Sequence, residues 1–240
     1  MVTGLALASK LSSAFVVLFV ITYLSVRLIR DYLADRRRPR WQLLVAGLLV
    51  SGLVSTLTFR IAQPYAFSGS NILDFRLAQD FLNAINQQRQ IQEGTYDWPP
   101  GIQWASTLPY LFPLKNIVLW GLGFPLGLAA LASLIFAIYR LVVRNDWPLF
   151  LPVLWIVLYF IYFGALVLKT MRYYQPIYPM LVMLVAWLLF YIWDSRQRTR
   201  LLGRYSSAVA MFLGVVVVLG AVVWSLAFTS IYTRPATRIT

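Results

Sequence analysis

The sequence contains no cysteine, no histidine and only eight acidic residues in 240. Without cysteine there are no disulfides and no thiol nucleophile, and the usual zinc sites lose their ligands. Histidine general-base catalysis is excluded as well. A hard cation held by carboxylates stays open, but the eight acids are scattered along the chain. We therefore expect neither a metal nor a cofactor.

Apolar sequence is what the chain has in abundance. Hydrophobic residues make up 60% of it and charged residues only 12%, far from the averages of soluble proteins. Six continuous apolar runs are each long enough to cross a hydrocarbon core of about 30 Å. None alternates with a period of two, which disfavours a barrel. The sequence predicts an all-α polytopic membrane protein, a single transmembrane domain over 1–240 with about six helices at 13–29, 42–59, 116–139, 148–168, 176–193 and 207–231.

The net charge of +13 is distributed in the way that membrane topology predicts. Arginines cluster after the first, third and fifth runs, which is the pattern of cytoplasmic loops facing anionic lipid. This placement favours membrane lipids rather than nucleic acid as the partner of the charge. Both termini and the segment 60–115 are then extracytoplasmic. The clustered residues are Arg27, Arg30, Arg36, Arg37, Arg38 and Arg40, then Arg140 and Arg144, then Arg196, Arg198, Arg200 and Arg204.

The external segment 60–115 predicts an amphipathic helix at about 72–92. Asn71 is a plausible N-cap, and Gly94 falls just past the end. Apolar residues recur every four positions on one face, so the helix lies either flat on the outer membrane surface or over the mouth of the bundle. The stretch that follows is rich in proline and is expected to be an interfacial loop held by Trp98, Trp104, Tyr110 and Phe112.

The third apolar run contains glycines and a proline with expected structural roles. Gly123 and Gly127 form a small-xxx-small step that permits close packing of helices. Pro125 is expected to kink this helix.

A short turn after the fourth run places two cations, Lys169 and Arg172, on the less basic outer side. One interpretation is that both side chains extend toward lipid headgroups. The other is a phosphate site, because arginine offers a fork of donors and lysine a point charge. Lys115 and Arg60 are candidates for the same place.

Several segments together resemble a family of membrane glycosyltransferases. The stretch Gly4-Leu-Ala-Leu-Ala-Ser-Lys10, followed by a membrane helix, resembles the GLAxxTK segment of polytopic sugar transferases related to protein O-mannosyltransferases and aminoarabinose transferases. The segments 60–67, 98–104, 110–127 and 169–179 resemble a prokaryotic, phospholipid-carrier-dependent branch of this group, which has the GT-C fold. The resemblance covers most of the chain.

The resemblance implies a larger fold, located in the plasma membrane of a prokaryote, that transfers a sugar from polyprenyl phosphate to an acceptor outside the cytoplasm. In that family the acidic residue that activates the acceptor lies in the first external loop. This chain resembles only the C-terminal half of the family's membrane domain. We therefore expect a fragment or a split protein, with an N-terminal half or a partner subunit supplying the catalytic loop.

The family's K-x-x-R-Y stretch matches Lys169, Arg172 and Tyr173, which implies contact with the carrier phosphate. A cation there would stabilise the charge that builds on the departing phosphate. Asp97 is the best of the outer acids as an acceptor base, since Trp98-Pro-Pro fixes the backbone beside it. Two alternatives remain open, a transporter or flippase component for a lipid-linked sugar and a non-catalytic membrane subunit. The helix interiors hold no acids, which counts against transport.

Overall fold

The computed structural model describes residues 1–10, 13–35, 41–69, 71–194 and 205–233. These residues form helices and no strand, apart from one isolated antiparallel bridge between Phe67 and Leu77. The all-α prediction is therefore confirmed. The chain divides into two compact units, Met1–Gly101 and Ile102–Thr240, where the sequence predicted one domain over 1–240. The predicted basic clusters at 36–40 and 196–204 lie outside the described residues.

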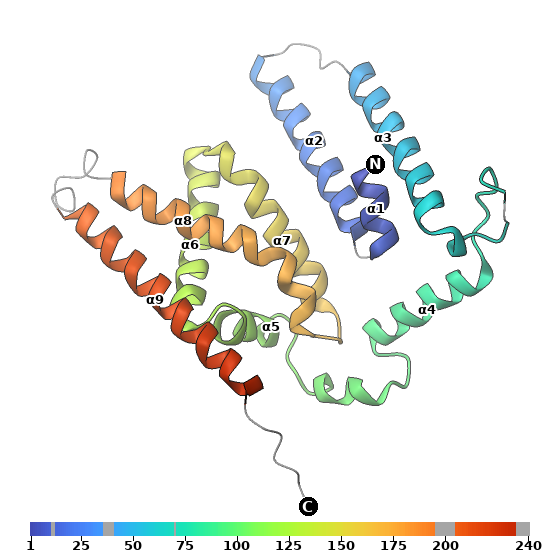
Figure 1. The fold of residues 1–240 in the computed structure, drawn as a ribbon. Coiled ribbons are helices and arrows are strands. Elements are labelled where there is room, and N and C mark those ends of the chain that lie inside the picture. The colour runs from blue at the N-terminus through green and yellow to red at the C-terminus, as the bar shows by residue number, and fades with distance from the viewer. Residues whose placement is uncertain (11–12, 36–40, 70, 195–204, 234–240) are drawn as a thin grey trace, which may run out of the picture. The chain divides into compact units, whose positions relative to one another are not determined.

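Each of the six predicted apolar runs is mostly helical, although the third is divided among several helical segments (Figure 1). Five described helices are long and apolar enough to cross a membrane, at Val45–Ala62, Phe124–Arg144, Trp147–Ala165, Met171–Asp194 and Ser206–Ile231. The helix of the first run, α2 (Ala14–Asp35), is not among them, because Arg27, Arg30 and Asp31 fall in its second half. The chain thus has the composition of a multi-pass membrane protein, and the sixth span stays a prediction.

The first unit begins with the short helix α1 (Val2–Ser9), which packs against α3 (Trp41–Ala62). Gly4 is buried at this contact, and a Cβ built on it would overlap the carbonyl oxygen of Ser55. Only glycine permits this close approach of two helices. The glycine of the 4–10 segment therefore has a packing role.

The helix predicted at about 72–92 is shorter than expected. The structure has α4 at Gln79–Glu93, ended by Gly94 in the left-handed conformation, as Gly94 predicted. The predicted start is wrong, because Asn71 and Asp74 bond to the backbone two residues on. The Leu73 amide donates to Asn71 Oδ1 and the Arg76 amide to Asp74 Oδ1. Such turns compete with the helix, which starts only after them.

The second unit interrupts the third predicted run. In place of one kinked helix the chain forms three segments, α5 (Leu111–Asn116), the short π-helix η4 (Ile117–Gly121) and α6 (Phe124–Arg144). Gly123 has a φ of 79°, which favours glycine, and Pro125 stands in the first turn of α6. The predicted kink at Pro125 is therefore wrong, since this proline begins a helix. The stretch before α5 contains the 3-10 turn η3 (Pro99–Trp104).

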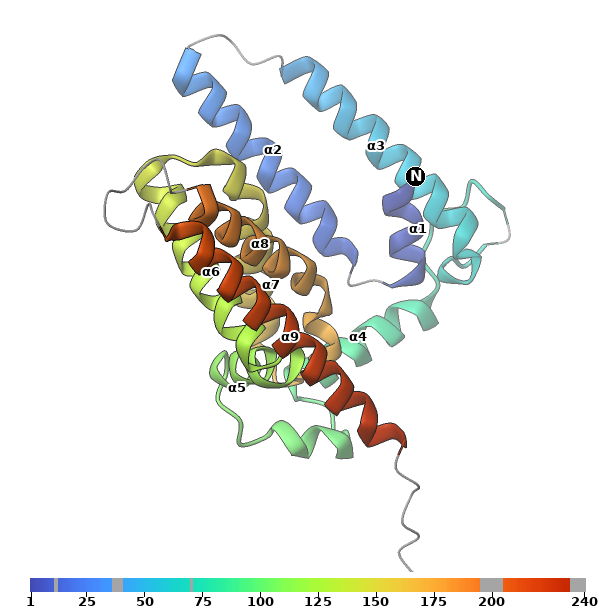
Figure 2. The same cartoon turned by 60° about the vertical axis from the view of Figure 1, so that its left-hand side comes forward.

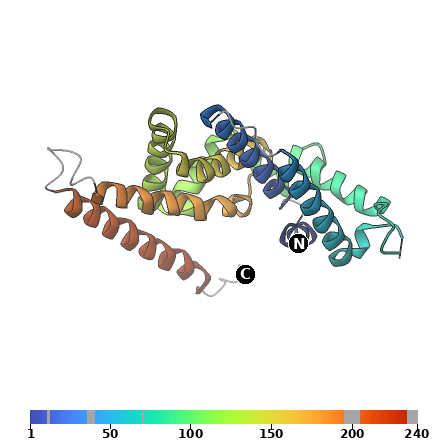
Figure 3. The same cartoon turned by 90° about the horizontal axis from the view of Figure 1, so that it is seen from above.

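After α6, the described part of the second unit contains three longer helices and two 3-10 turns. In chain order they are η5 (Trp147–Leu149), α7 (Phe150–Ala165), η6 (Met171–Ile177), α8 (Tyr178–Asp194) and α9 (Ser206–Thr233). Helix α8 packs against α6, α7 and α9 (Figures 1 and 2), and Figure 3 shows α8 and α9 side by side.

The direction of these helices gives the second unit two ends. We call one of them the η6 end; it consists of α5, η4, the last turn of α7, and η6. We call the other the η5 end; it consists of the last turn of α6, η5 and the last turn of α8. Every membrane-spanning helix of this unit thus has one terminus at each end, and the predicted cations Lys115, Lys169 and Arg172 all belong to the η6 end.

Candidate functional site

The turn between α7 and α8 is held in place by aromatic side chains. Gly164 lies under the ring of Tyr110, where a Cβ would overlap the ring, and its carbonyl accepts a hydrogen bond from the Tyr110 amide at 3.1 Å. Tyr174 is fully buried, and its hydroxyl donates to the Phe163 carbonyl at 3.0 Å. Trp155 Nε1 donates to the Pro176 carbonyl at 2.9 Å. The turn is therefore a packed and hydrogen-bonded platform.

Lys169 is the most unusual side chain of this platform. It is only 4% exposed, and its one hydrogen bond within the described residues runs from Nζ to the Val167 carbonyl at 3.4 Å. An ammonium has three donors, and a buried charge normally has an anionic or several polar partners. Burial lowers the pKa of Lys169 below its ordinary value. The cation is accordingly placed for an anion that the described chain does not provide.

Arg172 and Tyr173 continue the platform toward solvent. Arg172 is exposed, and its guanidinium carbon lies 6.0 Å from the centre of the Tyr173 ring. That ring stacks on Phe163 at 5.7 Å with an interplanar angle of 21°. The three residues of the predicted K-x-x-R-Y stretch thus combine a buried cation, an exposed cation and an aromatic surface.

Lys115 lies at the same end, exposed in the last turn of α5. The adjoining turn η4 packs on η6, where Gly121 lies against Tyr178 and Met171. The second unit contains two acids in its sequence, Asp146 and Asp194, and both belong to the η5 end. Among the described residues of the second unit, the η6 end therefore carries three cations, and neither of the unit's two acids belongs to it.

Arg60 and Asp97 belong to the first unit, whereas Lys115, Lys169 and Arg172 belong to the second. Arg60 is only 4% exposed, and its Nη2 donates to the carbonyls of Gly69 and Asn71 at 2.7 and 2.8 Å. Its guanidinium also lies 4.7 Å from the centre of the Phe67 ring. These contacts give Arg60 a structural role, and its contact with a carrier phosphate stays a prediction.

The outer acids are exposed or paired. Asp97 is exposed between α4 and η3, and its role as acceptor base stays a prediction. A side-chain hydrogen bond from Arg76 lowers the pKa of Asp74. Glu93 accepts a hydrogen bond from Arg89 at 2.7 Å. Within the described ranges, no three acidic side chains gather in a group that would hold a metal ion.

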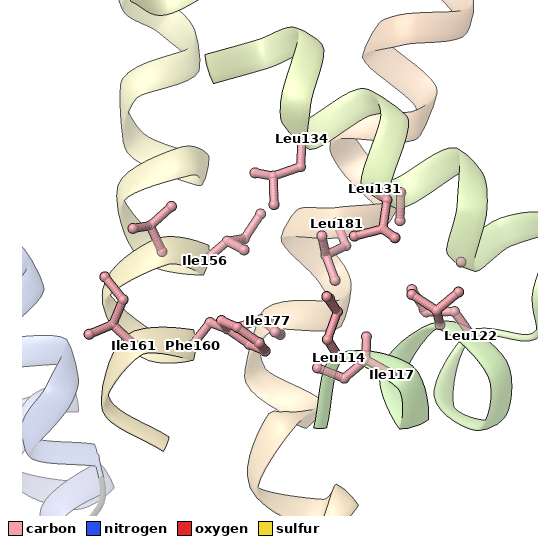
Figure 4. Close-up of a pocket in the computed structure, with 14 residues that line it drawn as sticks. Leu114, Ile117, Leu122, Leu131, Leu134, Ile156, Phe160, Ile161, Ile177 and Leu181 are labelled. Atoms are coloured by element: carbon pink, nitrogen blue, oxygen red, sulfur yellow. The ribbon is translucent and has the colours of Figure 1, made fainter. Parts of the chain in front are cut away.

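A cavity of about 150 Å³ lies within the second unit, between α5, η4, α6, α7, η6 and α8 (Figure 4). Its lining is entirely apolar, and it includes Leu114 beside Lys115 and Ile177 of η6. An apolar cavity of this size stays dry and holds a benzene-sized group. This cavity was not predictable from the sequence, because it depends on the π-helical segment η4 and on Gly127, whose Cβ would overlap the Val118 carbonyl. Gly127 was visible in the sequence only as a small residue that permits close packing.

Comparison with known proteins yields no relative on which a function could be based. The resemblance to carrier-dependent glycosyltransferases therefore stays a prediction that rests on the sequence segments quoted above. No protein-family model, no curated protein and no solved structure matches this chain.

Proposed function

We propose that this chain is part of an integral-membrane glycosyltransferase, a longer or split protein, that transfers a sugar from a polyprenyl-phosphate carrier outside the cytoplasm. The η6 end binds the phosphate of the carrier. The observation that carries the proposal is Lys169, a buried cation whose Nζ makes a single long hydrogen bond.

A phosphate supplies what Lys169 lacks. Burying an ammonium is costly unless an opposite charge and hydrogen-bond acceptors come with it. Phosphate oxygens accept from the two donors of Nζ that have no partner in the described residues. Arg172 adds a planar fork of donors, and Lys115 adds a further positive charge. The absence of carboxylates from this end leaves the positive field uncompensated.

The apolar surroundings favour a lipid phosphate over a soluble one. The cavity, whose lining includes Leu114 and Ile177 of the same end, accepts no polar group without loss of hydrogen bonds, whereas a hydrocarbon group of the lipid fits it. Lys169 also follows directly on a candidate membrane span, so its depth is that of lipid headgroups.

In the proposed reaction the cations stabilise charge on the departing carrier phosphate. Charge grows on the phosphate oxygens as the bond to the sugar breaks, and fixed positive groups lower the energy of that transition state. The acceptor base comes from Asp97 or from a part of the protein outside this chain. A transporter of lipid-linked sugar is the alternative, but the described spans hold no acid away from their ends.

The proposal is tested by titrating the intact chain in detergent with polyprenyl phosphate and following its thermal stabilisation. We expect stabilisation that grows with ligand concentration. Arg172→Ala should weaken binding about tenfold, the value of a charged hydrogen bond. Arg144→Ala is the matched control, because it removes an exposed arginine from the η5 end.

Two further ligands identify the source of the phosphate. Inorganic phosphate and phosphatidylglycerol carry the same chemistry without the polyprenyl chain. Equal binding of phosphatidylglycerol would contradict a carrier site. If the Arg172→Ala variant binds polyprenyl phosphate as tightly as the unchanged chain, Arg172 does not bind the carrier. Its side chain then extends toward lipid headgroups, which is the first of the two interpretations given for it above.

A further inference from the structure

A second feature lies in the first unit, in the segment 64–77 between α3 and α4, which we call the outer hairpin. Figures 1 and 2 show this segment turning back beside the last turns of α3 rather than extending away from the helix. Arg60, in the last turn of α3, bonds to the carbonyls of Gly69 and Asn71 and so holds them at its own level. Because α3 is a candidate span that ends at Ala62, that level is the membrane interface.

The base of the outer hairpin is fixed to α3 as well. Phe67 packs edge-on against Phe59 with ring centres 5.7 Å apart. Two backbone hydrogen bonds of 2.9 Å close the hairpin, from the Ser68 amide to the Arg76 carbonyl and from the Ala78 amide to the Ala66 carbonyl. The segment is thus a braced structure with a defined direction.

Large apolar side chains of the outer hairpin are exposed, beside exposed Asn71 and Arg76. Tyr65 is 89% exposed, Ile72 61% and Leu73 76%, and Phe75 and Leu77 are exposed too. The single acid nearby, Asp74, forms an ion pair with Arg76 and adds no net charge. Exposed apolar side chains of this size favour transfer from water into an apolar environment.

Several backbone groups of the hairpin find their hydrogen-bond partners within the protein. The Asn71 carbonyl accepts from Arg60 and from the Asp74 amide, and the Leu73 amide donates to Asn71 Oδ1. A loop in water obtains these bonds from solvent and needs no buried arginine to supply them. In a membrane, irregular backbone is tolerated only where the protein itself satisfies it.

We infer that the outer hairpin inserts its apolar side chains into the outer lipid leaflet beside α3. The occupant of this surface is the boundary between headgroups and acyl chains. Arg60 acts as the internal hydrogen-bond donor that allows the backbone to enter, and α4 follows from the hairpin along the membrane surface. This inference is independent of the proposed enzymatic function.

The absence of cysteine makes a direct test simple, since a spin label attached to one introduced cysteine reports a single position. The full chain is reconstituted in phosphatidylcholine–phosphatidylglycerol nanodiscs with the label at Leu73→Cys or, separately, at Ile72→Cys. Power saturation is measured with oxygen, which concentrates in lipid, and with a nickel chelate, which stays in water. Matched labels at Leu49→Cys in α3 and Gln87→Cys on the polar part of α4 define the lipid and water references.

We expect the labels at Leu73 and Ile72 to follow the Leu49 reference, with more oxygen than nickel contact. Arg60→Met should move the Leu73 label toward the water reference, because the backbone carbonyls then need solvent. Nickel contact equal to that of Gln87 would overturn the inference. Protection from both reagents would overturn it too, since the hairpin would then be covered by protein.

Discussion

The two ends of the Ile102–Thr240 unit differ in how they surround a cation, half-buried Arg140 at one end and buried Lys169 at the other. At the η5 end, Arg140 donates through Nε and Nη2 to Asp146 and through Nη1 to the Tyr191 hydroxyl at 2.8 Å. Its guanidinium also lies 4.8 Å from the centre of the Tyr191 ring. At the η6 end, Lys169 has only the Val167 carbonyl at 3.4 Å.

Under the proposed function, this difference separates a structural cation, Arg140, from a phosphate-binding cation, Lys169. Arg140 finds its carboxylate and its acceptors within the fold, so its charge is already compensated. Lys169 is more deeply buried than Arg140, and it has no carboxylate partner within the described residues, while its neighbours Lys115 and Arg172 are exposed. A buried charge without a partner marks a site where the fold gives up stability for function.

The largest expected effect breaks the paired end. Asp146→Ala leaves Arg140 without its carboxylate and should lower the free energy of unfolding by about 2 kcal/mol, less than for a fully buried pair because Asp146 is partly exposed. Denaturant unfolding of the intact chain in detergent measures it. The double variant Arg140→Met, Asp146→Ala should regain part of the lost free energy of unfolding, because no unpaired charge is left. If the effects of the two substitutions on the free energy of unfolding simply add, the two residues are not a coupled pair.

Next in size is the change at the cation without a partner. Lys169→Met keeps the length of the side chain and removes the charge, so the free energy of unfolding should stay the same or rise. Affinity for polyprenyl phosphate should fall about tenfold, or about 1.4 kcal/mol. Thermal unfolding without the ligand measures the stability, and the stabilisation on adding polyprenyl phosphate measures the affinity. A variant that unfolds more easily and binds as before would make Lys169 a structural residue like Arg140.

The smallest expected effect is a dependence of stability on alkaline pH. Burial lowers the pKa of Lys169 below its ordinary 10.5. Between the lowered pKa and 10.5, the unfolded chain holds a proton that the folded chain has released, so the free energy of unfolding rises with pH in that window. Lys169→Met should flatten this part of the profile, and polyprenyl phosphate should flatten it as well. Identical profiles for the two proteins would show that Lys169 is not desolvated.

The apolar runs predicted the helices because period and length alone decide where a chain can form a membrane helix. The boundaries depended on single residues and were less predictable. Pro125 was interpreted as a kink, yet it stands in the first turn of α6 since Gly123 breaks the chain just before it. The start of α4 shifted to Gln79 because the Asx turns of Asn71 and Asp74 compete with a helix locally.

The sequence predicted which residue types belong to the candidate site, but it did not predict the hydrogen-bond partners of these residues. The sequence grouped Arg60 with Lys169, Arg172 and Lys115 as outer cations. The structure shows Arg60 occupied by the carbonyls of Gly69 and Asn71, a contact that no periodic pattern encodes. The isolation of Lys169 likewise follows from the folding of the turn, since sequence alone cannot tell a buried cation from an exposed one.

The most direct measurement uses the lysines themselves, of which the chain has three, Lys10, Lys115 and Lys169. The chain is labelled with ¹³C at the lysine ε carbon, each signal is assigned by a Lys→Arg variant, and all are titrated by NMR with and without polyprenyl phosphate. We predict that the pKa of Lys169 lies below its ordinary 10.5 and rises when the ligand is added, because the phosphate stabilises the charged form. A Lys169 pKa that does not respond to the ligand would contradict a phosphate site at the η6 end.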